Sequence, residues 1–175
     1  LSTGLCGYRD IKKQLRLFKN KRKIVLMQCT SEYPSSIKST GIDVIKKLKS
    51  KFNVFTGLSD HSGKISPALM ALSLGAKVIE VHFKINESKD NLDKNASLNL
   101  KELKFLCDCR DEIYTMRNHK INKNILSQEQ IRNKKIFTKS IALKKDMKKN
   151  ETIKESDITF KKPGYGIKYN NVQKI

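Results

Sequence analysis

The sequence predicts an α/β fold over its first two-thirds, followed by a small β-rich module. Three short apolar runs, typical of buried parallel strands, alternate with stretches in which apolar residues recur at helical spacing. The strand-like runs recur about every 20 to 30 residues, which is the spacing of βα repeats. From Ile136 onward, short strand-like runs around polar turns replace this pattern.

The expected strands are Lys23–Cys29 (KIVLMQC), Val54–Leu58 (VFTGL) and Lys77–Phe83 (KVIEVHF). Leu1–Gly4 has the character of the end of an earlier strand. Four strands and four helices would make half of an eight-stranded β/α barrel, which as a whole needs about 250 residues. A short doubly wound sheet is the alternative.

Four helical segments lie between and after these strands. The third is expected to begin at Ser66-Pro67, with serine as N-cap and proline as first helical residue, and to end at Gly75. The apolar stripes of the other three consist of Ile11, Leu15 and Phe18, of Ile42, Ile45, Leu48 and Phe52, and of Leu103, Leu106, Cys107, Ile113 and Met116.

The last third of the chain has a different composition. His119–Asn133 is polar and is expected to be irregular, with a capping motif at Ser127–Gln130. A turn is expected at Pro163–Gly166, after three strand-like runs at Ser140–Leu143, Glu151–Ile153 and Ile158–Phe160. We therefore expect a domain over residues 1–118, a linker over 119–136 and a β-rich module over 137–175.

The net charge of +20 invites a nucleic-acid function, which the composition does not favour. Of the 37 basic residues 31 are Lys and only 6 are Arg, whereas base and phosphate recognition favours Arg. The chain has no Trp and no alternation of aromatic and basic residues. We expect a solvated lysine-rich surface, weak polyanion binding at low salt and no specific nucleic-acid partner.

No uncharged apolar run approaches the roughly 20 residues of a membrane helix, so no membrane partner is expected. The four cysteines do not have the density of a disulfide scaffold, which predicts a reducing, cytoplasmic location. Cys107 and Cys109 form a C-x-C pair within an expected helix, and a zinc site there is not expected because there is no second pair.

Polar residues gather where the expected strands end, which is where β/α barrels place their catalytic groups. These ends are Ser2–Gly4, Cys29–Pro34, Ser59–Gly63 and Glu80–His82. His61 and His82 follow adjacent strands and could converge on one divalent cation; two unrelated loop histidines are the alternative. Glu80 and His82 stand two apart in a strand and therefore share a face.

Seven segments in order carry a family resemblance: LSTG, CTSEYP, GLSDHSG, VIEVHF, LDKNASL, SIALKKDMKKNETI and DITFKKPGYGI. Together they resemble the sialic acid synthase family, which includes N-acetylneuraminate, legionaminate and pseudaminate synthases. The resemblance runs through essentially the whole chain. It implies the second half, strands 5–8, of a TIM-type β/α barrel, followed by a truncated antifreeze-like (SAF) domain.

The resemblance also implies an activity. The family condenses phosphoenolpyruvate with an N-acetylated aldose, of the N-acetylmannosamine type, to a nine-carbon 2-keto sugar acid with release of phosphate. His61 and His82 match its metal ligands, the metal being Mn²⁺ with Mg²⁺ or Co²⁺ as alternatives. The complete protein is then expected to be a domain-swapped homodimer.

Further site residues are implied by the same match. Glu80 matches a catalytic carboxylate; Ser2, Ser31 and Ser59 match phosphoenolpyruvate-binding positions; Tyr33, Asp93 and Lys162 match sugar-side positions. Three of these residues have a simpler alternative: Ser2 as a strand-end cap, Glu80 as a partner that orients His82, and Tyr33 as packing against Pro34.

The sequence departs from the family pattern at three positions. Lys94 replaces a frequent His, Gln28 stands where a His often precedes the cysteine, and Lys162 replaces a frequent Arg. Lys keeps the charge of Arg but not its bidentate fork, so either the affinity for the sugar or the identity of the sugar is expected to differ. A non-catalytic fragment or split-gene half with only a binding role is the alternative to the synthase.

Overall fold

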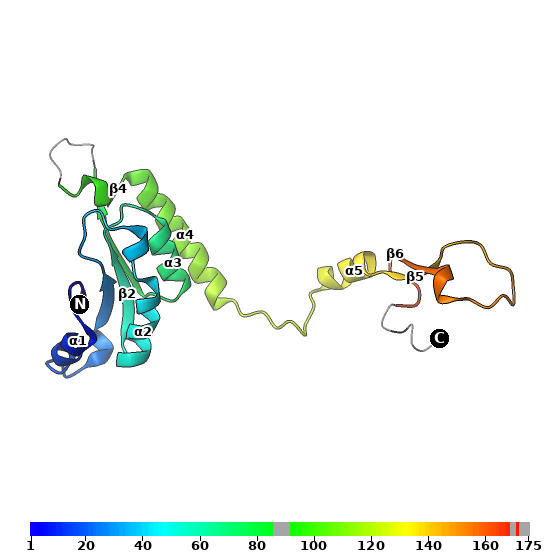
Figure 1. Cartoon of the computed structure of the whole chain (residues 1–175), viewed down its shortest axis with the longest axis horizontal. Helices are drawn as coiled ribbons and strands as arrows, with labels where there is room; N and C mark the ends of the chain where they lie inside the picture. Colours follow the sequence, from blue (N-terminus) through cyan, green and yellow to red (C-terminus); the bar gives the residue numbers. More distant parts are fainter. Residues whose placement is uncertain (86–91, 169–170, 172–175) are drawn as a thin grey trace. The chain divides into compact units, whose positions relative to one another are not determined.

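The computed structural model describes residues 1–85, 92–168 and 171, which form two compact units, Leu1–Lys120 and Ile121–Ile175. The first unit is a parallel sheet with helices against it, and the second contains a helix and a pair of antiparallel strands (Figure 1). Within the described residues, no helix is both long enough and apolar enough to cross a membrane.

The sheet of the first unit has the order β1-β2-β3-β4, and all neighbouring strands are parallel. Their bounds are β1 (Val25–Cys29), β2 (Phe55–Asp60), β3 (Val78–Phe83) and β4 (Ser97–Leu98). The strands expected from the three apolar runs are therefore confirmed. The strand expected at the start of the chain is reduced to one parallel bridge between Ser2 and Met27. The sequence does not predict β4, because two residues are too short to show an alternating pattern.

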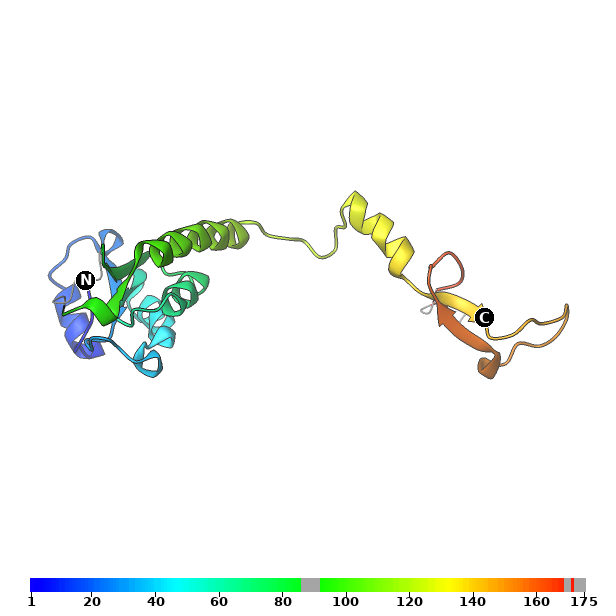
Figure 2. The same cartoon turned by 90° about the horizontal axis from the view of Figure 1, so that it is seen from above.

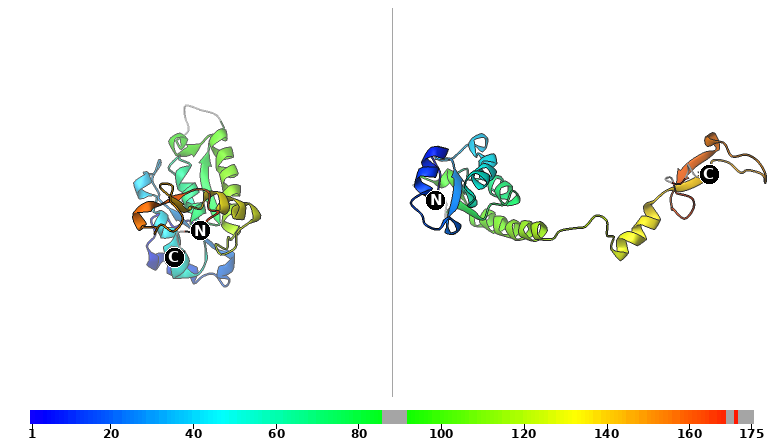
Figure 3. Two further views of the ribbon diagram at one scale, coloured as in Figure 1. Left: turned by 90° about the vertical axis from the view of Figure 1, so that its right-hand side faces the viewer. Right: turned by 90° about the horizontal axis from the view of Figure 1, so that it is seen from below.

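Four helices belong to this unit. Helices α2, α3 and α4 lie on one side of the sheet (Figures 1 and 3). Helix α1 packs on that side too, since its Ile11 and Leu15 cluster with Leu26 and Leu48. The helices are α1 (Tyr8–Leu15), α2 (Ile42–Phe52), α3 (Ser66–Ser73) and α4 (Leu100–Asn118). Helix α4 lies beside α3 (Figure 2). Helix α3 starts where the sequence predicts, but its N-cap is Ile65 and not Ser66, so the serine is its first residue.

The core lies between the helices and the alternate residues of the strands that face them. Ile45 and Leu48 of α2 are completely buried, as their stripe predicts, against Leu26 of β1 and Leu58 of β2. The stripes of the other two amphipathic helices are shorter than expected. α1 ends at Leu15 and leaves Phe18 40% exposed; in α4, Leu106 is buried, Cys107 half-buried and Met116 66% exposed.

The opposite face of the sheet has a different character. Phe55 and Val78 are the first residues of the adjacent strands β2 and β3, and their side chains remain exposed, at 50% and 40%. Parallel sheets are normally covered on both faces. This face therefore has the apolar character of a surface that another layer covers.

The second unit consists of α5 (Gln128–Phe137), β5 (Ser140–Leu143) and β6 (Ile158–Lys161), with β5 and β6 antiparallel. The capping box at Ser127 and Gln130 is confirmed, but the segment it opens is helical and not irregular. The strand expected at Glu151–Ile153 is wrong, because this run lies in the connection between β5 and β6 without ladder pairing.

We predict that Leu48→Ala lowers the free energy of unfolding by about 2–5 kcal/mol, because the change leaves a cavity at a side chain with no exposed surface. Lys46→Ala, at an exposed position of the same helix, is the matched control and should change stability by less than about 0.5 kcal/mol. Urea denaturation followed by circular dichroism measures both. Equal effects would contradict the assignment of α2 to the core.

Candidate functional site

Two histidines meet at the carboxyl ends of β2 and β3. The strands are parallel, with Ser59 opposite Glu80 and Asp60 opposite Val81, so the ends of the two strands lie at one edge. His61 follows β2 directly and His82 is near the end of β3. Their ring centroids are 5.1 Å apart, with an angle of 68° between the ring planes.

A tight turn after His61 keeps this arrangement in place. Gly63 has a φ of +64°, and a Cβ there would lie 2.2 Å from the carbonyl oxygen of Asn95. Only glycine tolerates both the left-handed conformation and the close approach. The turn thus brings the segment after β2 against the residues just before β4.

An oxygen atom near each imidazole indicates which of its two ring nitrogens carries the proton. His61 Nδ1 lies 2.9 Å from the carbonyl oxygen of Thr30, which can only accept, so Nδ1 carries the proton and Nε2 the lone pair. His82 Nδ1 lies 3.5 Å from Asp93 Oδ2. In both residues, therefore, Nδ1 faces an oxygen acceptor and Nε2 is the nitrogen suited to a ligand.

This donor set fits a divalent metal, since metal-binding histidines usually donate their second ring N–H to a carbonyl or a carboxylate. The two imidazoles supply two ligands only. Nowhere in residues 1–85, 92–168 and 171 do three or more His, Cys, Asp or Glu side chains form a cluster suited to a metal ion. A metal held here would take its other ligands from water or from a bound substrate.

Tyr33 covers the histidine pair. Its ring stacks on His61, with centroids 4.2 Å apart and planes at 28°, and stands edge-on to His82 at 5.7 Å. Its hydroxyl lies 3.3 Å from His61 Nε2. His61 is only 6% exposed, whereas Tyr33 is 52% exposed, so the phenol forms the outer wall of the site.

Ser59 and Glu80 form a second pair, two residues before the histidines in the same strands. Ser59 Oγ donates a hydrogen bond of 2.6 Å to Glu80 Oε1, and the two residues are register partners in the sheet. Glu80 and His82 share a face, as their spacing predicts. The carboxylate beside His82 is that of Asp93, so the contacts do not favour Glu80 as the group that orients this histidine.

The remaining expected site residues, Ser2, Ser31 and Lys162, have no hydrogen bond to the residues of this cluster among the contacts described. Ser2 and Ser31 are both exposed, and Ser31 Oγ lies so near Gly4 that a Cβ on the glycine would be 2.3 Å from it. Lys162 belongs to the second unit, where its ammonium lies 5.1 Å from the ring centroid of Phe137. The structure therefore brings His61, His82, Tyr33, Asp93, Ser59 and Glu80 together, with Ser2 and Ser31 on adjoining segments.

Comparison with known proteins shows the family of the chain. The model of the NeuB family matches residues 1–122, which is more than half of the chain. The chain belongs to the NeuB family. The match contains every expected site residue except Lys162.

Named relatives specify the kind of enzyme in this family. The chain is 37% identical over 171 residues to N,N'-diacetyllegionaminic acid synthase of Campylobacter jejuni, covering 95% of this chain and 51% of the relative. It is 34% identical over 170 residues to pseudaminic acid synthase of the same organism, covering 95% and 48%. This NeuB-family chain therefore spans about half the length of the curated relatives that it matches.

A solved structure extends the similarity to three dimensions. The N-acetylneuraminic acid synthetase of Leptospira borgpetersenii, crystallised with citrate, matches with a TM-score of 0.66 and 31% identity, covering 77% of this chain and 48% of that one. The α/β fold with a parallel sheet is thus shared with a sialic acid synthase.

Asp60 lies directly before His61 at the end of β2, and sequence reasoning did not single it out. The residue is only 3% exposed, and burial raises the pKa of its carboxyl above the usual value. Oδ2 accepts a 2.7 Å hydrogen bond from Ser62, while Oδ1 is buried without a hydrogen-bond partner among the residues described. A carboxyl directly before a histidine at the end of an apolar strand was the available signal.

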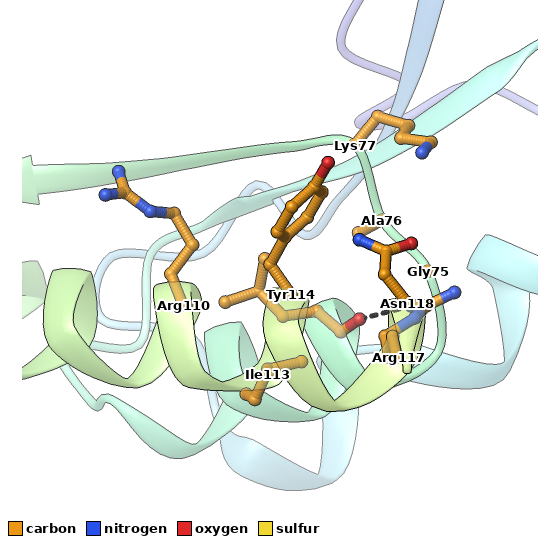
Figure 4. Close-up of a pocket in the computed structure, with 9 residues that line it drawn as sticks. Gly75, Ala76, Lys77, Arg110, Ile113, Tyr114, Arg117 and Asn118 are labelled. Carbon is orange, nitrogen blue, oxygen red and sulfur yellow. Dashed lines mark hydrogen bonds between the residues drawn. The ribbon is translucent and has the colours of Figure 1, made fainter. Parts of the chain in front are cut away.

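The structure also contains a hollow at the other end of β3, away from the histidine pair. Its volume is about 280 Å³, and its wall includes Tyr114 and Arg117 of α4 (Figure 4). Arg117 Nη1 donates to the carbonyl oxygens of Leu72 and Ser73, the last residues of α3. This guanidinium therefore caps a helix C-terminus, which is a structural role.

We predict that Asp60→Asn raises the free energy of unfolding at pH 7. The raised pKa means that the ionised carboxylate is unfavourable in the folded chain, so wild-type stability falls as pH rises through the folded pKa. The extra stability of the Asp60→Asn variant should disappear below about pH 4, where the wild-type carboxyl is protonated in both the folded and the unfolded chain. Ser62→Ala should have the opposite effect and serves as the control. It should lower the free energy of unfolding by about 1–3 kcal/mol, because Asp60 Oδ2 loses its hydrogen-bond donor. Denaturant titrations at pH 7 and pH 3.5 measure both, and a destabilised Asp60→Asn variant would contradict the prediction.

Proposed function

We propose that this chain corresponds to the C-terminal part of a sialic acid synthase-type transferase and carries its metal site. The reaction joins the methylene carbon of phosphoenolpyruvate to the aldehyde carbon of an N-acetylated aldose, such as N-acetylmannosamine. Water adds at the second carbon of the former phosphoenolpyruvate, and phosphate leaves to give a nine-carbon 2-keto sugar acid. The observation that carries the proposal is the His61–His82 pair at adjacent strand ends of a NeuB-family domain.

The shape of the first unit supports a partial barrel. Five parallel strand positions, counting the Ser2 bridge, have helices on one face, and an apolar face remains around Phe55 and Val78. In a TIM-type barrel that second face is the interior, which further strands would complete. On this proposal the Ser2 segment, β1, β2 and β3 are strands 5–8 of the barrel, and β4 is a short addition beside β3. The second unit corresponds to part of an SAF domain.

The metal in this proposal is Mn²⁺, with Mg²⁺ or Co²⁺ as alternatives, and His61 and His82 would hold it. When bound, such a cation acts as a Lewis acid that polarises the carbonyl oxygen of the aldose. The carbonyl of Thr30 and the carboxylate of Asp93 orient the two imidazoles for this task.

Glu80 is the residue that we assign to proton transfer. It lies on the same face of β3 as His82, and the hydrogen bond from Ser59 restrains its carboxylate. A restrained carboxylate next to the reacting carbons is suited to take the proton from the water that adds. Because Ser59 is only 2% exposed, the structure supports it more strongly as the partner of Glu80 than as a direct contact of phosphoenolpyruvate.

Ser2 and Ser31 are the hydroxyl donors that remain accessible for phosphoenolpyruvate, since both are exposed on adjoining segments. Tyr33 and Asp93 contact the histidines, which supports our assignment of both residues to the aldose. We assign Lys162 to the sugar in the domain-swapped homodimer that we expect of the complete protein.

We predict that phosphate release from phosphoenolpyruvate and N-acetylmannosamine depends on Mn²⁺ and falls by about 100-fold or more in His61→Ala and in His82→Ala, because each loses a metal ligand. A coupled phosphate assay on this chain, and on any longer reading frame that encloses it, measures the effect. His119→Ala is the matched control, since this exposed histidine terminates α4, and it should retain full activity.

Equal loss in all three variants would show a general folding defect and not a metal site. If neither the chain nor a longer reading frame releases phosphate with any N-acetylated aldose, the synthase proposal is wrong. A non-catalytic fragment with a binding role is then the better account.

A further inference from the structure

We infer that the first unit has a second binding site, a basic hollow that takes a short phosphate chain at the edge of the sheet opposite to the histidine pair. The hollow has a volume of about 240 Å³ and is lined by Lys12, Leu15, Arg16, Lys21, Lys51 and Phe52. None of these residues has a part in the proposed synthase reaction, so the inference does not depend on the proposed function.

The position of the hollow in the fold separates it from the histidine pair. Lys21 lies in the short 3₁₀ helix Lys21–Lys23 that leads into β1, and Phe52 is the last residue of α2, just before β2. Both residues therefore stand at the amino ends of parallel strands, whereas His61 and His82 lie at the carboxyl ends. A ligand in the hollow would leave the histidine pair free.

Positive charge is concentrated around the hollow. Residues 8–23 and 46–52, which supply its whole lining, contain 12 Lys and Arg but one acid, Asp10, whereas the chain as a whole has 37 basic and 17 acidic residues. The Asp10 carboxylate is occupied at the start of α1, where it accepts a 2.9 Å hydrogen bond from the backbone N–H of Gly7. In the part of the chain that the structure describes, none of the four lining cations forms an ion pair.

The C-terminal ends of α1 and α2 offer a structural alternative for these side chains. Lys12 and Lys51 lie in the last turns of the two helices, where a cation stabilises the partial negative charge of a helix end. Each end carries only about half an elementary charge, so the two ends offset about one of the four positive charges. About three charges remain, which suits a ligand that has several negative charges on adjacent groups.

Aromatic and apolar packing fixes the walls of the hollow. Tyr8 of α1 and Phe52 of α2 have ring centroids 6.3 Å apart, and Lys51 Nζ lies 4.6 Å from the centroid of the Tyr8 ring. Leu15 is 2% exposed and belongs to the core cluster against which Phe52 packs. A lysine held over an aromatic ring loses less conformational freedom when it binds an anion, so the site is partly preorganised.

Size and composition favour a short phosphate chain over a nucleic acid. Pockets for drug-sized ligands have about 300–1,000 Å³, and this hollow is smaller. Sites for single-stranded nucleic acid combine basic residues with aromatic rings on which bases stack, but Phe52 is half-buried and packs on the core. Inorganic polyphosphate and the phosphate tail of a nucleoside triphosphate share the chemistry that the hollow fits.

The double variant Lys12→Ala/Lys21→Ala tests the site, because both side chains are exposed and their loss should not disturb the core. We expect the 175-residue chain to bind tripolyphosphate at one site, and the double variant to bind it about 10-fold or more weakly, since each lost cation removes a charge-assisted contact. Isothermal titration calorimetry in EDTA, which removes metal ions, measures both dissociation constants. Arg16→Ala, also at an exposed position, is a second variant and should weaken binding about 3-fold or more.

Lys148→Ala/Lys149→Ala is the matched control. It removes the same net charge from exposed positions of the second unit. In about 0.1 M NaCl, where distant charges are screened, it should bind tripolyphosphate within about 2-fold of wild type. Far-ultraviolet circular dichroism confirms that each variant is folded.

ATP in the same titration distinguishes the two sources of a phosphate chain. Tighter binding of ATP than of tripolyphosphate would identify a nucleotide as the ligand, whereas equal or weaker binding would identify the phosphate chain itself. In either case the Lys12→Ala/Lys21→Ala variant should weaken the binding.

Equal weakening in the two double variants would overturn the inference, because the charge would then act only in general. The absence of tripolyphosphate binding by the wild-type chain would also overturn it, as would loss of binding in His61→Ala, which would place the anion at the histidine edge. A single-stranded oligonucleotide that binds more tightly than tripolyphosphate, and loses this affinity in Lys12→Ala/Lys21→Ala, would show a nucleic-acid surface instead. Failure of the synthase proposal would leave all these titrations unchanged.

Discussion

The parallel register between β2 and β3 is the constraint on which the site depends. The ladder places Ser59 opposite Glu80, and therefore brings His61 and His82 to one edge of the sheet two residues later. A shift of one residue in either strand would turn its side chains to the other face. Leu58, which is buried against Ile45, opposes such a shift because it would then leave the core. The hydrophobic core on one face thus maintains the polar cluster on the other.

Sequence pattern alone predicts the parts of this arrangement that repeat. β1, β2 and β3 follow from apolar runs, α2 follows from its stripe, and the histidine pair follows from the ends of parallel strands. The expected roles of these residues in catalysis stay predictions. Periodicity does not predict an element that is short or polar. Strand β4 has two residues, and the polar helix α5 has no apolar stripe.

The contacts that give the site its chemistry have no local sequence signature. The acceptor for His61 is the backbone carbonyl of Thr30, 31 residues away, and every residue type supplies such a carbonyl. The stacking of Tyr33 on His61 depends on how the segment after β1 returns toward the end of β2. Asp60 could have been suspected from its position, but its unpaired oxygen follows only from the packing around it. The residue types of a site are thus easier to predict than their protonation and their partners.

The two histidines differ in how firmly they are held, and this difference assigns them different roles. His61 is buried and bonded to the backbone at the end of β1, so its orientation is coupled to the core of the sheet. The side chain of His82 is 32% exposed and faces the side chain of Asp93, which is itself 45% exposed. A side-chain carboxylate can follow its partner, whereas a backbone carbonyl in a packed sheet cannot. His61 is therefore the fixed reference of the site, and His82 with Asp93 is the part that can adapt to a ligand.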